Sequence, residues 1–142
     1  MTSYLDTSFL VSLYTPDANS GAAAEIIAGS GRERLVTTFG ELELVNALGL
    51  RVLRKEISAA QAEVAWADFE EDIRDGVFQL RPVGEQVFGR ARELSRQTTA
   101  KLGTRTADLL HVAAALELGA DILYSFDQQQ RKLAKAVHLK LS

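Results

Sequence analysis

The sequence predicts an α/β protein, a three-layer α/β/α sandwich built on a short, mostly parallel central sheet. Short apolar runs of strand type alternate with helical patterns along the chain, which is typical of strands joined by crossover helices. The stretch 103–127 shows this most clearly, because an apolar helix stops at Gly119 and the apolar run Ile122–Tyr124 follows as a buried strand. The sequence contains no internal repeat, linker or low-complexity segment, so one domain is expected over residues 1–142.

The composition is that of a soluble globular protein. Apolar residues make up 46% and charged residues 25% of the chain, which excludes a disordered protein. No apolar run approaches membrane-spanning length, and the N-terminus lacks a signal-peptide pattern, so no membrane association is expected. Cysteine is absent, which removes disulfides, thiolate catalysis and cysteine-based zinc sites and suits the reducing cytoplasm where we expect the protein.

The charge balance limits how nucleic acid could be bound. The formal net charge is −3, from 16 basic and 19 acidic residues. This excludes a dominant basic surface, so binding to nucleic acid would depend on a local basic patch or on metal ions.

The N-terminal residues are expected to form a strand followed at once by a helix. Ser3–Leu5 is a short strand, and Asp6 follows at its end. The helix begins at the next residue, where either Thr7 or Ser8 is available as its N-cap. Pro16–Asp17 breaks this helix, because proline cannot continue it.

A second helix, a second strand and a long third helix come next. Asp17–Ala28 is rich in small residues and is expected to be helical, ending at Gly29–Ser30–Gly31. Leu35–Thr37 is a short strand. Thr38 can cap the helix that runs from about Phe39 to Lys55, whose apolar residues recur at spacings of three or four and make it amphipathic.

The middle of the chain is expected to contain a helix and a third strand. Ser58 stands where it can cap a helix over Ala59–Arg74. After a break at Gly76 the strand Val77–Leu80 follows, and Pro82 closes it.

The C-terminal third is mostly helical. Glu85–Arg96 is expected to be a helix with its apolar residues on one side, and Thr98–Gly103 is expected to be a polar connection. The apolar helix and strand of the stretch 103–127 come next. A short helix, Gln129–Ala136, and a last strand, Val137–Leu141, complete the predicted elements.

Acidic residues stand at corresponding places in these elements. Asp6 and Asp127 each follow a strand, Asp108 lies in the first turn of the late helix, and Glu41 or Glu43 lies in the first turns of the helix from Phe39. Strand C-termini and the following helix N-termini share one edge of an open parallel sheet, where ligands bind. We therefore expect these acids around one pocket. Carboxylates of this kind suit Mg²⁺, which can generate a hydroxide nucleophile and neutralise charge on a phosphodiester.

Each acid also has a purely structural explanation. An aspartate in the first turn of a helix often only caps the helix or interacts with its dipole, and this applies to Asp108 and Asp127. Glu41 and Glu43 point about 200° apart on a helix, so only one of them can face the pocket. The two histidines, His111 among them, have no partner at ligand spacing and are expected in structural or surface roles.

Four segments resemble, in chain order, the motifs of PIN-domain nucleases. The three main motifs correspond to Tyr4–Leu10, Thr38–Leu48 and Arg105–Ala115, and the fourth corresponds to Ser125–Asp127. A strand that ends in aspartate is common, but all four motifs in this order form a specific pattern. The resemblance covers nearly the whole chain and points to the toxin ribonucleases of VapBC-type toxin–antitoxin modules.

The resemblance implies roles for individual residues. The catalytic and metal-binding roles fall to four acids: Asp6, Glu43, Asp108 and Asp127. Glu41 is the alternative for the second acid. Ser8 and Ser125 match small hydroxyl positions that help to hold the acids or a metal-bound water, and Arg105 matches a basic residue that contacts phosphate.

The same resemblance implies metal-dependent hydrolysis of RNA phosphodiester bonds, with Mg²⁺ or Mn²⁺ as the cofactor. Toxins of this type form homodimers and are blocked by a cognate antitoxin whose tail fills the acidic groove, so a homodimer and an antitoxin partner are both expected. The helical pair 39–74 is the usual place for such contacts. Val64, Trp66 and Phe69 are apolar candidates there, and core packing is their alternative explanation.

Two other functions stay open beside the toxin: a housekeeping RNA-processing nuclease and a catalytically silent binding module that keeps the fold. A Mg²⁺-dependent phosphatase or receiver domain is disfavoured. A phosphatase would need a second aspartate two residues after Asp6, where Ser8 stands. A receiver would need its acceptor aspartate at the end of the third strand, where Arg81–Pro82 stand.

Overall fold

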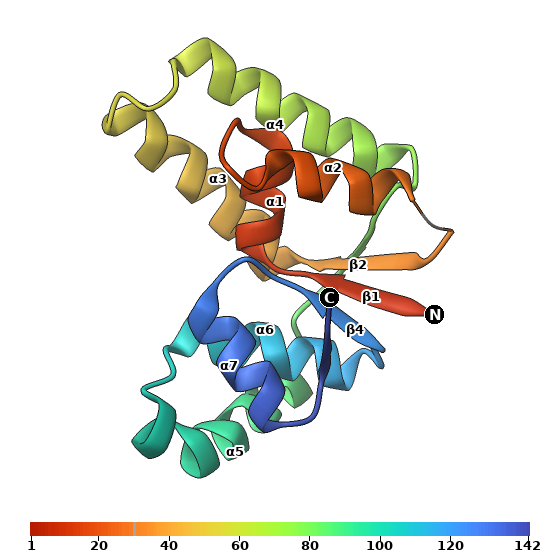
Figure 1. The fold of residues 1–142 in the computed structure, drawn as a ribbon, viewed down its shortest axis with the longest axis vertical. Helices are drawn as coiled ribbons and strands as arrows, with labels where there is room; N and C mark the ends of the chain where they lie inside the picture. Colours follow the sequence, from red (N-terminus) through yellow and green to blue (C-terminus); the bar gives the residue numbers. More distant parts are fainter. Residues whose placement is uncertain (30) are drawn as a thin grey trace.

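A parallel sheet of five strands lies between two layers of helices in the computed structural model, which describes residues 1–29 and 31–142 (Figure 1). The strand order is β3-β2-β1-β4-β5, and every neighbouring pair is parallel. The described strands are β1 (Thr2–Leu5), β2 (Glu33–Thr37), β3 (Gln79–Arg81), β4 (Ile122–Tyr124) and β5 (Lys140–Leu141). This confirms the predicted α/β fold with a short parallel sheet.

The described helices divide between the two faces of the sheet. Helices α1 to α4 lie on one side of it, and α5 to α7 lie on the other (Figure 1). Their bounds are α1 (Thr7–Tyr14), α2 (Ser20–Ala28), α3 (Thr38–Leu53), α4 (Ala59–Arg74), α5 (Glu85–Leu102), α6 (Thr106–Glu117) and α7 (Gln128–Ala136).

Each face of the sheet packs on its own hydrophobic core. Successive residues of a strand point to opposite faces, so Tyr4 of β1 joins the core beneath α5 to α7, while Leu5 joins the core beneath α1 to α4. Val112 of α6 and Phe69 of α4 are fully buried in these two cores. The sheet is therefore covered on both faces, and its edges are the places left for ligands.

Strand β1 is the centre of the sheet, with Tyr4 in register with Leu35 of β2 on one side and Leu123 of β4 on the other. The chain moves from β1 to β2 through α1 and α2, whereas α5 and α6 on the opposite face lead to β4. The order of strands therefore reverses between β1 and β4. In open α/β sheets, ligands bind at the C-terminal edge at such a point. Asp6 stands there, and its N–H donates to the carbonyl of Tyr124 at 3.3 Å.

Helix α4 and strand β4 have the predicted bounds. Ser58 caps α4 as predicted, because its hydroxyl accepts a hydrogen bond from the N–H of Gln61 at 3.0 Å. The side chain of Gln61 accepts one in return from the N–H of Ser58 at 2.7 Å. This reciprocal pair is a capping box, and it gives α4 a well-defined start.

Two helices are capped by an earlier residue than predicted. Asp6 caps α1, in place of Thr7 or Ser8, and Thr37 caps α3, in place of Thr38. Each side chain accepts a hydrogen bond from a backbone N–H in the first turn of its helix. In both places the helix follows the strand without a loop, so the residue at the strand end takes the cap.

Helix α5 is longer than predicted, because it continues beyond Arg96 to Leu102 through the expected polar connection. Thr98 is buried in this last part, and its hydroxyl donates to the carbonyl of Leu94 at 2.6 Å. A threonine can satisfy its hydroxyl within a helix in this way. The helix ends at Gly103, whose φ of 66° is the left-handed conformation that favours glycine.

Other elements are shortened or shifted. Helix α2 begins at Ser20 and not at Asp17, whose carboxylate accepts from the N–H of Asn19 and forms a turn. Helix α3 ends at Leu53, and strand β3 is displaced to Gln79–Arg81.

The last strand is also shorter than predicted. Only Lys140–Leu141 pair with β4, because His138 turns the chain with a φ of 61°. The predicted helix stop at Gly29–Ser30–Gly31 includes Ser30, which lies outside the described residues. Within the described part of the chain, no helix combines the length and the apolar character needed to cross a membrane.

Candidate active site

Asp6 stands where β1 meets α1, and only 2% of the residue is exposed. Its Oδ1 accepts hydrogen bonds from the N–H of Phe9 at 3.0 Å and from the hydroxyl of Ser8 at 2.6 Å. Burial raises the pKa of Asp6, although His111 and hydrogen bonds from Ser125 and Ser8 oppose this shift. The ionised carboxylate therefore stands to gain from a cation that enters the site.

Ser8 and Ser125 join the end of β1 to the end of β4. The hydroxyl of Ser8 accepts from the N–H of Phe126 at 2.9 Å while it donates to Asp6, and the two serine hydroxyls lie 3.4 Å apart. The hydroxyl of Ser125 accepts from the N–H of Asp127 at 3.1 Å. The two serines thus hold the two strand ends, and the acids that follow them, in one arrangement.

Asp108 lies in the first turn of α6 and is 3% exposed. Its carboxylate accepts a hydrogen bond from the N–H of Arg105 at 3.1 Å, so it also closes the start of the helix. The Arg105 side chain folds back onto the same carboxylate, with Nε 3.2 Å from Oδ2 and Nη2 3.3 Å from Oδ1. Asp108 therefore stabilises the start of α6, as its structural explanation predicted, and it lines the pocket as well.

Asp127 uses its two oxygens for two purposes. Oδ1 caps α7 by accepting from the N–H groups of Gln129 at 2.8 Å and Gln130 at 3.1 Å. Oδ2 lies 3.0 Å from Nη2 of Arg105, which therefore bridges Asp127 and Asp108. Hydrogen bonding and charge from Asp108, followed by Asp127, raise the pKa of the guanidinium.

Of the two glutamates left open by the sequence, Glu43 lines the pocket and Glu41 does not. Oε1 of Glu43 accepts a hydrogen bond from the hydroxyl of Thr7 at 2.5 Å and lies 2.5 Å from Nε2 of His111. Partial burial raises the pKa of Glu43, but the hydrogen bonds from His111 and Thr7 lower it further, so the net pKa is lowered. Glu43 is thus held in its ionised form.

Side chains from α1, α3, α6 and α7, and from the residues that cap α1, α6 and α7, meet in one pocket of about 290 Å³ at the C-terminal edge of the sheet. It is lined by Asp6, Thr7, Ser8, Glu43, Arg105, Ala107, Asp108, His111, Asp127 and Gln130. All four acids singled out in the sequence are among them, and so are Ser8 and Arg105. Ser125 lies behind this lining, in contact with Ser8.

The donor chemistry of the pocket suits a hard divalent cation, because its acids offer several carboxylate oxygens and no sulfur. The buried carboxylate of Asp6, with its raised pKa, would be stabilised by such a cation. Among the described residues, no group of three acidic or histidine side chains is already arranged to hold a metal. The guanidinium of Arg105, whose side chain is 63% exposed, brings positive charge to the pocket instead.

His111 has a structural role, which was one of the two expected for it, and its partners come from distant parts of the chain. His111 is buried, lines the pocket and contacts Glu43, which belongs to a different helix. The available signal was its place three residues after Asp108, because residues three apart share one face of a helix. The second histidine, His138, is exposed in the turn after α7, as expected for a surface residue.

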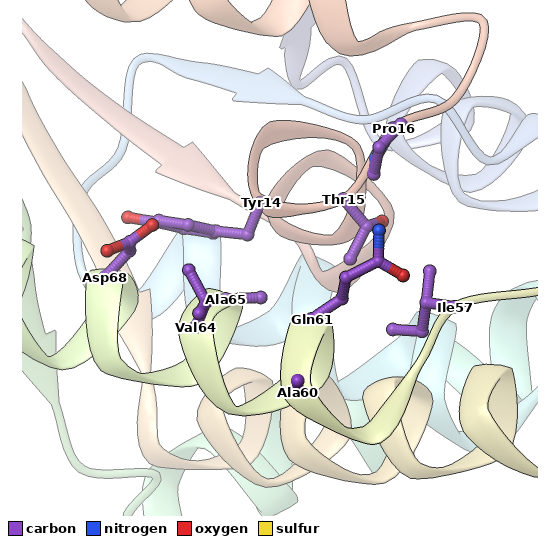
Figure 2. Close-up of a pocket in the computed structure, with 9 residues that line it drawn as sticks. All are labelled: Tyr14, Thr15, Pro16, Ile57, Ala60, Gln61, Val64, Ala65 and Asp68. Carbon is purple, nitrogen blue, oxygen red and sulfur yellow. The ribbon is translucent and has the colours of Figure 1, made fainter.

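A second pocket, of about 320 Å³, lies between the end of α1 and helix α4. Figure 2 shows Tyr14 and Pro16 on one side and Ile57 and Val64 on the other. Of the three apolar residues proposed for partner contacts, Phe69 is fully buried in the core and Trp66 packs partly buried against it. Val64 is exposed and lines this pocket.

Several solved structures are similar to this chain over nearly its whole length. VapC20 of Mycobacterium tuberculosis, described as a sarcin–ricin loop cleaving toxin, is 20% identical with a TM-score of 0.72, over 92% of this chain and 93% of that one. VapBC2 of Rickettsia felis, bound to a promoter DNA fragment, is 15% identical with a TM-score of 0.69, over 100% and 98%. FitAcB of Neisseria gonorrhoeae is 16% identical with a TM-score of 0.67, over 98% and 95%.

These identities are low, so the structures show a shared fold and no more. No curated protein is similar enough in sequence to match the chain. The family model described as the PIN domain, however, matches residues 3–136, which is nearly the whole sequence. The chain therefore belongs to the PIN-domain family.

Proposed function

We propose that this protein is a metal-dependent endoribonuclease formed by a single PIN domain. PIN domains are typically nucleases, and the family generally uses divalent metals. The observation that carries the proposal is the pocket itself, in which Asp6, Glu43, Asp108 and Asp127 come from separate elements to one sheet edge. Such a concentration of carboxylates is unfavourable without a cation and suits phosphodiester hydrolysis with one.

The four acids would hold Mg²⁺ or Mn²⁺, which when bound lowers the pKa of a water molecule and neutralises charge on the phosphodiester. The residues around them keep the acids in place. Ser8 holds the carboxylate of Asp6, and Ser125 holds the backbone of Asp127. Arg105 reaches the pocket from the solvent side and is the group best placed to contact an RNA phosphate.

We further propose that the protein is the toxin of a toxin–antitoxin pair in the cytoplasm. The structures of VapBC2 and FitAcB are those of complexes with toxins of the same fold. The apolar pocket beside Val64 (Figure 2) would receive part of the antitoxin, whose arginine would pair with the acids. A homodimer is proposed because α3 exposes apolar side chains at helical spacing, those of Leu42, Val45 and Leu53.

One observation favours a catalytically silent module as the second candidate. Arg105 already pairs with both Asp108 and Asp127, and a pocket stabilised by this pairing would need a metal less. The two functions predict opposite results in a cleavage assay.

The deciding experiment incubates the purified protein with structured RNA at increasing Mn²⁺ or Mg²⁺. We expect cleavage that requires the metal and is lost in Asp6→Asn, where the amide keeps the cap but removes the charge. Asp17→Asn is the matched control, since the carboxylate of Asp17 accepts a backbone hydrogen bond in a turn and lies outside the pocket. No cleavage by either protein would support the silent module, and equal cleavage by both would show that the activity does not depend on Asp6.

A further inference from the structure

His111 is fixed in position from several directions. The residue is 3% exposed, and its ring packs against Tyr4, with centroids 5.7 Å apart, and against Phe39, with centroids 5.2 Å apart. Both ring nitrogens have partners: Nδ1 lies 2.7 Å from the hydroxyl of Tyr4, and Nε2 lies 2.5 Å from Oε1 of Glu43. The ring therefore connects β1 to α3 from its own place on α6.

The partners determine which nitrogen carries the proton. Glu43 is ionised and can only accept a hydrogen bond, so Nε2 of His111 must donate to it. In a neutral imidazole the other nitrogen, Nδ1, is then an acceptor. The phenol of Tyr4 supplies the proton for that bond, because a tyrosine hydroxyl is protonated at neutral pH. The chain of donors thus runs from Tyr4 through His111 to Glu43.

Glu43 is held by side-chain hydrogen bonds, whereas the other acids of the pocket are also held by the backbone. Backbone N–H groups hold all three aspartates of the pocket. Among the described residues, the hydrogen bonds to Glu43 come from side chains alone, those of Thr7 and His111. Both fall on Oε1, and Oε2 has no hydrogen bond in the described part of the chain, which leaves it available to a cation.

We propose that His111 is a positioning residue that holds the carboxylate of Glu43 ready for a divalent cation, with Tyr4 setting the orientation and tautomer of its ring. This inference rests on the proposed function, in which Glu43 binds the metal. Partners that hold metal ligands in this way typically change metal affinity by about 10-fold to 100-fold when they are removed. His111 does not touch the metal or the RNA in this role.

The test measures Mn²⁺ binding to RNA-free protein by calorimetry, so that it does not depend on catalysis. His111→Leu introduces an apolar side chain of similar size and removes the donor, and we expect the Kd for Mn²⁺ to rise about 10-fold or more. His111→Gln keeps an N–H donor near the place of Nε2, and we expect it to recover the affinity to within about threefold of the wild type. Thermal unfolding of both variants shows whether stability alone separates them.

The possible results separate this inference from the proposed function. A wild type that binds no Mn²⁺ overturns the proposed function, and the inference with it. A wild type and a folded His111→Leu with equal Kd values overturn the inference alone, as does a His111→Gln that binds no better than His111→Leu. Should His111→Leu fail to fold, Tyr4→Phe decides, because it removes only the hydroxyl behind the ring. We expect its Kd to rise by about threefold, and an unchanged value would overturn the inference.

Discussion

The pocket has an inner side and an outer side, which hold their carboxylates in opposite ways. On the inner side, the side chains of Thr7 and His111 bond to Glu43, and His111 is almost completely buried. On the outer side, the charged and largely exposed side chain of Arg105 bridges two aspartates, one of them Asp108. The same chemical group is therefore held by a buried framework in one place and by a solvent-exposed cation in the other.

This difference indicates which side can open. An exposed ion pair is worth about 0–1 kcal/mol and is screened by salt. Leaving a buried hydrogen-bonding group without its partner costs about 1–3 kcal/mol. We therefore expect Arg105 to leave its aspartates readily when a cation or an RNA phosphate arrives, while the inner side keeps its arrangement.

We expect the largest effect when one acid is removed from either side of the pocket, because a shared cation needs acids from both sides. Glu43→Gln on the inner side and Asp108→Asn on the outer side each remove one charge at nearly constant size. We expect each to lower kcat/KM for RNA cleavage by about 100-fold or more, measured from initial rates at fixed Mn²⁺. Glu41→Gln is the control on the same helix as Glu43, outside the pocket, and is expected to stay within about threefold. Equal losses in both glutamate variants would contradict the assignment.

The next largest effect is the stabilisation of the folded protein by a bound cation. Without a cation the clustered carboxylates repel one another, so Mn²⁺ at 100 times its Kd is expected to raise the free energy of unfolding by about 2.7 kcal/mol. Urea unfolding of RNA-free protein, with and without Mn²⁺ at constant ionic strength, measures this gain. Asp6→Asn is expected to lose most of it, and Asp17→Asn to keep it. A full gain in Asp6→Asn would mean that the cation binds elsewhere.

A smaller effect is expected when the inner side of the pocket loses one hydrogen bond. Thr7→Val removes the hydroxyl that donates to Glu43 and keeps the shape of the side chain, so we expect a loss of about 1 kcal/mol in the free energy of unfolding. Thr38→Val makes the same change at an exposed position in the first turn of α3, where the effect should stay within about 0.5 kcal/mol. Chemical denaturation of both variants checks this. The inner side would not be a rigid framework if the two variants were equally stable.

The smallest effect is expected when the outer side of the pocket loses the guanidinium of Arg105. Arg105→Gln is expected to change the free energy of unfolding by less than about 1 kcal/mol, since its guanidinium is exposed and both aspartates keep hydrogen bonds from backbone N–H groups. Mn²⁺ should bind up to about fivefold more tightly, because the competing guanidinium is gone. Arg90→Gln, which breaks an exposed ion pair with Glu117 far from the acids, is the control and should leave Mn²⁺ affinity unchanged. Weaker Mn²⁺ binding in Arg105→Gln would show that Arg105 supports the site.

The sequence was sufficient where local rules decide the outcome. The alternation of strands and helices predicts the parallel sheet, and Ser58 marks the start of α4 because its capping box is a local pattern. It was insufficient where one residue has two uses. Asp6 lines the pocket and also caps α1. The sequence did not indicate this second role, because the hydroxyls of Thr7 and Ser8 are equally good caps. Thr98 looks like a loop residue, but its hydroxyl is satisfied inside α5.

The candidate site shows the same division. The acids at strand ends and helix starts follow from the topology, whereas periodicity alone left Glu41 and Glu43 undecided. The partners of these acids come from distant parts of the chain, and no local pattern indicates them. His111 lies 68 residues after Glu43, and Arg105 reaches Asp127 across 22 residues.

The most direct test of a shared cation is a crystal of the protein soaked in Mn²⁺ and measured at a wavelength where manganese scatters anomalously. We predict one or more anomalous peaks in the pocket, at about 2.1 Å from carboxylate oxygens of Asp6 and of at least one acid from each side, with the guanidinium of Arg105 displaced. A pocket without a peak at saturating Mn²⁺, or a peak that touches none of these acids, would contradict the proposed nuclease.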